Sequence, residues 1–442
     1  MGNLKKKQAA KKSKKTTKSR KEKDTPLHLQ LKYATDYFLS DLDCIMEMYE
    51  TVVPVLEEKD KLRNRRIEEI MDSLKNWRSQ NERPQKAELP KLMVEINELV
   101  DNVRKLDRAN DLFRQNALVM VISRYDQFVA ATFQNIFQAT PDRLKSPDKT
   151  LSYEEILQLG SVTNAVDKFI SKEIDSLLRE SHAEHVNYID KQMKIGLRES
   201  IKCWPTFIEI TERRNLFVHT GGSVSQQYIR TCKSNGVILD EKLKEGALLD
   251  VSEDYLREAY KCLLEVSVKI SQLVSRKLWP KEIETIDTAL NDIGLEFLIR
   301  EKWDLANIVF DFALSLPPKF ISDDAQYKIF VINKCISLNW SGDKSSMLKL
   351  LDSIDWSSAD SKFRLAVLVL RGDFKKAESI MSAMNGEDPI TEHDFRTWPL
   401  FRDFRKSENF KRAFKKIYKK EYMLELPEIE STIENSEIIL SG

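Results

Sequence analysis

The stretch ALVMVISRYDQFV, residues 117–129, decides the fold class of this chain. It is too apolar and too long for a strand flanked by polar helices, since strands usually run roughly four to eight residues. The pattern therefore predicts a buried helix that continues to about Phe137. Amphipathic helical patterns precede and follow it along most of the chain, so we expect an all-α protein.

The composition agrees with a helix-rich protein. The chain has 442 residues, of which 41% are hydrophobic and 32% charged, with only 12 Gly and 13 Pro. This content excludes a collagen-like or Gly/Pro-rich chain, and a β-sandwich would need more turn residues. At roughly 150 residues per domain, the length predicts about three domains.

Membrane segments and paired cysteines are not expected. No apolar run approaches the roughly 20 residues that span a bilayer, and the N-terminal lysines have no apolar secretion signal behind them. The odd number of cysteines and the lack of a CxxC pair argue against a zinc knuckle or a disulfide framework. We expect a cytoplasmic protein without cofactors, whose free thiols are Cys44, Cys203, Cys232, Cys262 and Cys335.

Basic residues concentrate at the N-terminus. Residues 1–24 hold eleven Lys and Arg against two acidic residues, a net charge of +9, although the whole chain carries only +1. Such a run repels itself and buries nothing, so it predicts a disordered tail over residues 1–26 that holds RNA or another polyanion. A solubility tail or a localisation signal is the alternative. The RNA-binding lysines would include Lys5, Lys6, Lys7, Lys11, Lys12, Lys14 and Lys15.

Residues 27–111 have a helical period and predict a helical hairpin. Pro54 is expected to interrupt the first arm, and the second arm begins at Lys91 after two Pro-containing breaks. The apolar face needs a cover, which is either the neighbouring helices of the same chain or a second copy. In the first arm this face recurs at three- and four-residue steps through Leu31, Ala34, Phe38, Leu42 and Ile45.

Residues 112–280 predict the next helical unit. After the buried helix, the pair Gly221-Gly222 breaks the pattern and a short irregular piece follows. Ser252, with two acidic residues behind it, suits the N-cap of a last helix. The helices between are expected at 151–178, 184–201 and 205–219.

Residues 283–420 repeat loosely and predict three helix pairs. The second helices would begin at Trp303, Asp343 and Phe374, which lie 40 and 31 residues apart. Their average is close to the roughly 34-residue period of tetratricopeptide repeats, which this region resembles. Such an array offers a concave surface for a protein, peptide or nucleic-acid ligand. The alternative is a helical extension that packs on the middle unit. After this region we expect an acidic tail over residues 421–442.

The string ERRNLFVHTGG, residues 212–222, carries the most chemistry. On a helix Asn215 and His219 share a face, and Arg214 lies at its edge, where a long side chain reaches round. The glycine pair suits a helix C-terminus, so His219 occupies the last turn, where the helix dipole favours a protonated imidazole. A proton-exchanging histidine beside an arginine that binds phosphate suits phosphodiester chemistry. A helix cap or a surface ion pair is the alternative.

Arg214-Asn215-x-x-x-His219 resembles the R-x4-6-H motif of the HEPN superfamily, most closely its RiboL-PSP type. In that type an RRN-x-x-VH helix is followed by a Gly-containing break, as in this chain. The early apolar helix and the final amphipathic helix also come in the expected order. One position departs from the family's toxins, because those silenced by a nucleotidyltransferase carry Tyr where this chain has Gly221. Silencing by adenylylation is therefore in doubt.

The resemblance implies a HEPN domain over residues 112–280 that acts as a metal-independent endoribonuclease. Two copies would pair as a homodimer, with Arg214 and His219 of both copies in one cleft. A 2′-hydroxyl of RNA would attack the adjacent phosphate while His219 handles a proton and Arg214 stabilises the phosphorane. Asn215 would orient the phosphate or the motif helix.

Two further residues would support that site. Asp126 stands where family members often carry a polar or acidic residue, and it would orient the catalytic side chains. A surface acid or a buried ion pair is an equal interpretation of Asp126. Arg213 is the second supporting residue. The pair His182 and His185 lacks a third ligand and does not predict a metal site.

The resemblance also implies a biological setting, that of an RNA-cleaving toxin or anti-phage defence effector controlled through the C-terminal array. The rival is a catalytically silent HEPN-like scaffold that binds nucleic acid or protein. The chain has no GxxxxGK[ST] loop, GxSxG elbow or GxGxxG fingerprint. Nucleotide-driven and serine-hydrolase functions therefore have no support.

Overall fold

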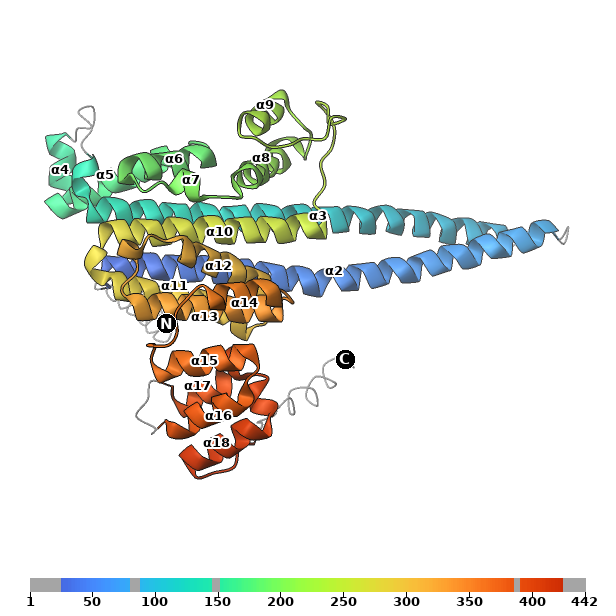
Figure 1. Ribbon diagram of the computed structural model, residues 1–442. Helices are drawn as coiled ribbons and strands as arrows, with labels where there is room; N and C mark the ends of the chain where they lie inside the picture. Colours follow the sequence, from blue (N-terminus) through green and yellow to red (C-terminus); the bar gives the residue numbers. More distant parts are fainter. Residues whose placement is uncertain (1–24, 80–87, 145–151, 385–389, 424–442) are drawn as a thin grey trace, which may run out of the picture. The chain divides into compact units, whose positions relative to one another are not determined.

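The structure is a computed structural model that describes residues 25–79, 88–144, 152–384 and 390–423 (Figure 1). It divides into two compact units, Met1–Ile286 and Asp287–Gly442. In the described ranges the regular secondary structure is helical, which confirms the all-α class. The basic tail and most of the acidic tail expected from the sequence lie outside the described residues.

Two long antiparallel helices run through the first unit, α2 (Leu27–Ser79) and α3 (Glu88–Ala139) (Figure 1). α2 continues through Pro54, so the interruption expected there is wrong. The proline removes a single backbone hydrogen bond. Packing on α3 holds the helix before and after Pro54, where Val53 and Ile70 are buried. α3 is likewise continuous through residue 111, so the hairpin expected over residues 27–111 does not end there.

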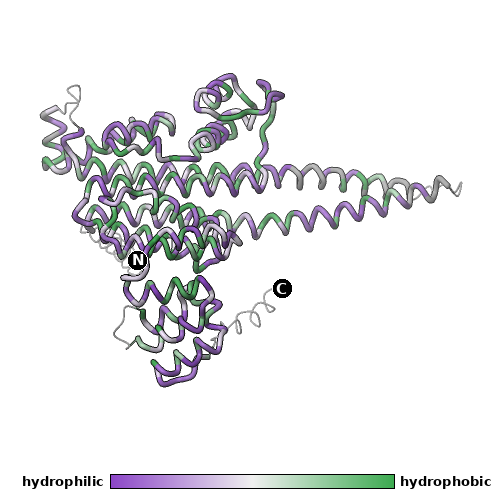
Figure 2. The backbone as a smooth tube through the Cα atoms, viewed as in Figure 1, coloured by the Kyte–Doolittle hydropathy of each residue, from purple (hydrophilic) through white to green (hydrophobic). Residues whose placement is uncertain are grey.

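The core of the first unit forms where α10 (Glu253–Leu278) packs against both long helices. The ring of Phe38 on α2 stacks on that of Phe128 on α3, with centroids 5.4 Å apart, and Tyr125 lies beside them. Figure 2 shows hydrophobic residues interspersed with hydrophilic ones along these helices, as expected for amphipathic elements. The first half of α2 therefore shares one core with the segment expected to form the HEPN domain. Ser252 caps α10 as predicted, because its side chain accepts a hydrogen bond from the Tyr255 amide.

Shorter helices lie along α3 and α10 in the first unit (Figure 1). The helix expected at 151–178 is two helices, because Gly160 turns the chain with a φ of 71°. The helix expected at 184–201 divides after Lys194, whose φ is 53°, and α9 occupies part of the piece expected to be irregular. The elements are η1 (Pro141–Leu144), α4 (Tyr153–Leu159), α5 (Val162–Leu177), α6 (His182–Met193), α7 (Leu197–Ser200), α8 (Trp204–Thr220), α9 (Gln226–Ser234) and η2 (Pro280–Glu282).

The second unit consists of helices that pack largely in chain order. Its second helices begin at Trp303, Lys344 and Phe374, at or within one residue of the starts that the sequence predicts. The tetratricopeptide layout itself stays a prediction. The elements are α11 (Ile283–Ile299), which begins in the first unit, α12 (Trp303–Ser315), η3 (Pro318–Phe320), α13 (Asp324–Trp340), α14 (Lys344–Asp352), α15 (Ser361–Arg371), α16 (Phe374–Ala383), α17 (Glu392–Thr397), η4 (Pro399–Phe401), η5 (Phe404–Lys406) and α18 (Glu408–Tyr418).

Close packing in the second unit depends on a glycine. The ring of Phe310 on α12 lies against Gly294 on α11, in space that a Cβ atom at position 294 would occupy. The rings of Trp303 on α12 and Trp340 on α13 also stack in this unit, with centroids 6.0 Å apart.

The starts of two helices in this unit are capped by aspartates. The side chains of Asp343 and Asp373 cap α14 and α16. These local signals explain why the helix starts could be read from the sequence.

Candidate functional site

The motif helix α8 ends where the sequence predicts. Gly221 takes the left-handed conformation with a φ of 62°, and its amide bonds back to the carbonyl oxygen of Leu216. His219 therefore lies in the last turn, and its side chain is exposed. A Cβ atom at Gly222, whose φ is 86°, would meet the ring of Phe217. The glycine pair thus both ends the helix and lets the chain leave it closely packed.

Asp126 on α3 connects three helices at the buried side of this motif. One carboxylate oxygen, Oδ2, lies 3.2 Å from Nη2 of Arg214 on α8. The other, Oδ1, accepts a hydrogen bond from Nε2 of His182 on α6 at 2.8 Å. Arg214 also donates from Nη1 to the side-chain oxygen of Asn215 at 3.1 Å. Arg214 therefore contacts two of the other predicted site residues, Asp126 and Asn215.

The electrostatics of this cluster keep Asp126 ionised. Burial alone would raise the pKa of its carboxyl, but the His182 hydrogen bond and the charges of His182 and Arg214 outweigh it and lower the pKa below its usual value. Glu212, two residues before Arg214 on α8, shows the opposite shift, because burial raises the pKa of its carboxyl. The Arg214 guanidinium, with its side chain 21% exposed, thus has a lasting anionic partner at neutral pH.

The histidine pair on α6 has a structural part in the cluster. His182 is the contact that the sequence reasoning missed, because it lies 56 residues from Asp126 and only the fold brings them together. His185 lies beside it, with ring centroids 5.4 Å apart, and donates from Nε2 to the carbonyl oxygen of Leu177. Burial lowers the pKa of His185 to about 4, so the ring is neutral. In the described part of the chain no group of three or more His, Cys, Asp or Glu is arranged to hold a metal ion.

Arg213 points into a different network from its neighbour in the motif. Its Nε bonds to the buried carboxylate of Glu209 at 2.7 Å, and its Nη1 donates to the carbonyl oxygen of Asp250 at 2.8 Å. Tyr228 and Tyr255 each donate a hydroxyl to the same carboxylate at 2.6 Å. Burial and this carboxylate raise the pKa of both tyrosines. Arg213 therefore belongs to a network, centred on Glu209, that links α8 to α9 and α10, and it does not contact the Asp126 cluster.

A groove runs between α2 and α3, apart from Arg214 and His219. Its volume is about 720 Å³, and Tyr37 on its wall is 74% exposed. The volume is in the range of small-molecule sites, which usually have roughly 300 to 1,000 Å³. Its walls are formed by Thr25, Gln30, Tyr33, Ala34, Tyr37, Phe38, Asp41, Arg124, Gln127, Phe128 and Ala131.

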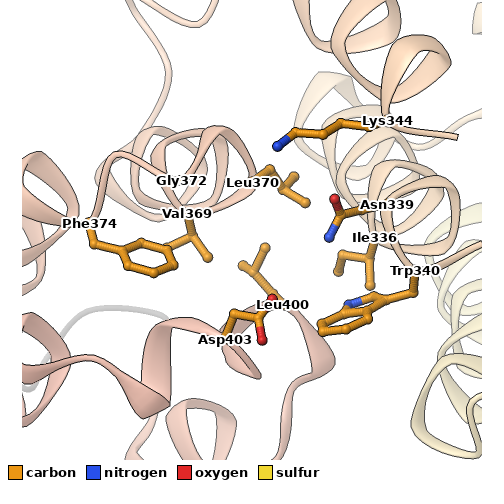
Figure 3. Close-up of a pocket in the computed structure, with 10 residues that line it drawn as sticks. All are labelled: Ile336, Asn339, Trp340, Lys344, Val369, Leu370, Gly372, Phe374, Leu400 and Asp403. Atoms are coloured by element: carbon orange, nitrogen blue, oxygen red, sulfur yellow. The ribbon is translucent and has the colours of Figure 1, made fainter. Parts of the chain in front are cut away.

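A smaller recess of about 120 Å³ lies in the second unit (Figure 3). Figure 3 shows Asn339 and Trp340 on one side of it, with Val369 and Phe374 across from them. Its volume is below the roughly 300 Å³ at which small-molecule pockets begin. The recess therefore has room for a ligand group no larger than a side chain.

Neither a family model, nor a curated protein, nor a solved structure matches the chain. The HEPN resemblance thus rests on the motif residues and the order of elements around them. Among the described helices, none is long and apolar enough to cross a membrane.

Proposed function

We propose that the chain is an endoribonuclease of the HEPN type, with His219 and Arg214 as its reacting residues. The observation that carries this proposal is their arrangement on α8: His219 is exposed in the last turn, and Arg214 is held by the ionised carboxylate of Asp126. An exposed imidazole can exchange protons with a bound substrate. A guanidinium that is already oriented binds phosphate with little reorganisation.

The reaction uses only groups that RNA and this chain supply. The 2′-hydroxyl of one nucleotide attacks its own 3′-phosphate, a P–O bond forms, and the bond to the 5′-oxygen of the next nucleotide breaks. His219 takes the proton of the attacking hydroxyl or returns one to the leaving oxygen. Arg214 binds the negative charge that gathers on the phosphorane. DNA is not cut, because it lacks the 2′-hydroxyl.

A second copy of the chain completes this site. The reaction contains two proton transfers, and one copy contributes a single His219. Two α8 helices facing one phosphate would supply two imidazoles and two guanidinium groups. The homodimer that the HEPN resemblance implies is therefore part of the proposal.

Other parts of the chain would serve the same activity. Residues 1–24, with a net charge of +9, would bind RNA by releasing counterions from its phosphates. The helices of the second unit would bind the protein or peptide that switches the enzyme on or off. A toxin or anti-phage effector needs such control, because uncontrolled RNA cleavage harms its own cell.

A binding module without catalysis is the second candidate, and the Asp126 ion pair favours it. Arg214 donates to Asp126 and Asn215 and has little exposed surface, so phosphate must compete with contacts that are already made. In this alternative His219 is a surface residue that helps to bind RNA or protein and moves no proton.

The test incubates the full chain with a mixed pool of tRNA and mRNA in EDTA. Wild type, His219→Ala and His393→Ala are compared, since His393 is also exposed but lies on α17 in the second unit. We expect wild type and His393→Ala to cut RNA and His219→Ala to leave it intact. If none of the three cuts RNA at concentrations that permit dimers, while wild type and His393→Ala bind it, the binding module is the better description.

A further inference from the structure

Two cysteines meet where α8 begins against α10. Cys203 is the N-cap residue of α8, Cys262 lies within α10, and their sulfur atoms are 3.1 Å apart. Each thiol also contacts the backbone carbonyl oxygen of the other residue, at 3.6 and 3.7 Å. A disulfide bond measures about 2.05 Å, so an approach of roughly 1 Å separates these free thiols from a covalent link.

Other contacts hold the two sulfur atoms together. Glu265, one turn after Cys262 on α10, accepts a hydrogen bond from the backbone amide of Lys202 at 2.8 Å. Lys269 pairs with the same carboxylate at 2.6 Å and donates to the carbonyl oxygen of Ser200. The segment before α8 is therefore tied to α10 without help from the thiols. These contacts keep the two sulfur atoms within about 1 Å of bonding distance.

The two thiols differ in access to solvent. Cys203 is partly exposed at the N-terminal end of α8. Cys262 is buried, and burial together with its contact with the Cys203 thiol raises its pKa well above the usual value. A partly exposed thiol in contact with a buried second thiol is the arrangement of an attacking and a resolving cysteine.

We propose that Cys203 and Cys262 are a modification site at which a peroxide forms a reversible disulfide. The thiolate sulfur of Cys203 attacks one peroxide oxygen, the O–O bond breaks, and a sulfenic acid and hydroxide form. The sulfur of Cys262 then attacks the sulfur of Cys203, expels its hydroxyl group as hydroxide and loses its own proton. Two thiols lose two electrons in total, the peroxide gains them, and two water molecules result. A dithiol reductant reverses the change, as in transient cytoplasmic disulfides.

The remaining cysteines serve as internal references. Cys232 and Cys335 are buried, and burial raises the pKa of each to about 12, which slows their oxidation. Cys44 is exposed on α2 and reports the reactivity of an ordinary surface thiol.

The disulfide would fasten the start of the motif helix to α10. It would close a loop between residues 59 positions apart, and such a link stabilises mainly by restricting the unfolded chain. We expect the thermal midpoint of the first unit to rise by about 5 °C or more on oxidation. This change is independent of whether the chain cuts RNA.

The experiment treats the purified full chain with hydrogen peroxide, blocks the remaining thiols, and maps the peptides by mass spectrometry. We expect a peptide pair joined through Cys203 and Cys262 and an intact mass lower by about 2 Da, both reversed by dithiothreitol. Cys203→Ser and Cys262→Ser should each abolish the linked pair, whereas Cys232→Ser should retain it. The mapping of wild type alone decides the outcome, so a variant that folds poorly does not affect the conclusion. Oxidation of Cys203 to the sulfinic acid without a linked peptide would overturn the proposal, as would unchanged thiols after peroxide.

Discussion

The carboxylate of Asp126 on α3 lies 3.2 Å from a guanidinium nitrogen of Arg214 on α8, although 88 residues separate them in the sequence. His182 on α6 bonds to the other oxygen of the same carboxylate. Arg214 is therefore oriented by a contact that neither its own helix nor its neighbours in the sequence provide. The proposed activity depends on that orientation.

Replacing Asp126 with Asn should separate positioning from folding. Asp126→Asn removes the charge that orients Arg214, so we expect kcat for RNA cleavage to fall at least about tenfold with KM little changed. The free energy of unfolding should fall by only about 1 kcal/mol, because the carboxylate is 32% exposed. Asp41→Asn is the matched control, since Asp41 pairs with Arg124 in the same unit at 3.6 Å. Equal loss of activity in both variants would contradict the positioning role.

The pH dependence of stability should report on His185. Burial lowers the folded-state pKa of this histidine from 6.5 to about 4. Between these values the unfolded chain binds a proton that the folded chain does not, so the free energy of unfolding falls as the pH falls. The loss should reach at most about 3 kcal/mol by pH 4.

His185→Gln should flatten this dependence, because Gln keeps a donor for the Leu177 carbonyl oxygen and does not titrate. Urea titrations followed by circular dichroism at several pH values measure the effect. His393→Gln, at an exposed position on α17, is the control. A wild-type profile that is flat between pH 6.5 and 4 would show that His185 does not contribute as described.

Removing the charge of Glu209 should destabilise the first unit strongly. Glu209→Gln leaves the half-buried guanidinium of Arg213 without its anionic partner and disturbs both tyrosine hydrogen bonds. We expect a loss of about 3 kcal/mol in the free energy of unfolding. Glu253→Gln breaks an exposed pair with Arg257 and should cost less than about 1 kcal/mol. Similar losses for the two variants in urea titrations would refute the anchoring role of Glu209.

The contact between Gly294 and Phe310 should not tolerate a methyl group. Gly294→Ala improves helix propensity by about 1 kcal/mol, but its Cβ atom would overlap the Phe310 ring. Overpacking should win, with a net loss of about 1 to 2 kcal/mol in the second unit. The double variant Gly294→Ala/Phe310→Leu should recover part of the stability, which thermal unfolding measures. A gain of stability in the single variant would mean that the ring moves freely aside.

Local signals account for what the sequence predicted correctly. The Gly221-Gly222 pair ends α8, Ser252 caps α10, and Asp373 caps α16, each through contacts within a few residues. Such contacts depend on the chain's immediate neighbours, so their patterns can be recognised without knowing the fold. The position of His219 in the last turn of α8 belongs to this class.

Long-range packing accounts for what could not be predicted. The continuity of α2 through Pro54 depends on α3 covering it, and the burial of apolar residues such as Leu31 and Leu42 depends on packing against α3 and α10. The contact of His182 with Asp126 likewise joins helices that the sequence places far apart. From the sequence, the pair His182 and His185 could only be considered as metal ligands and rejected for want of a third ligand, whereas the fold gives His182 a carboxylate partner.

The most direct test of the proposed activity examines how a defined RNA is cut. The substrate is compared with the same RNA carrying a single 2′-deoxy nucleotide at the position where wild type cuts, in EDTA. We predict 2′,3′-cyclic phosphate ends on the RNA, no cutting at the deoxy position, and no products with His219→Ala. Cutting at the deoxy position, or products from His219→Ala at the wild-type rate, would contradict a mechanism in which His219 activates the 2′-hydroxyl.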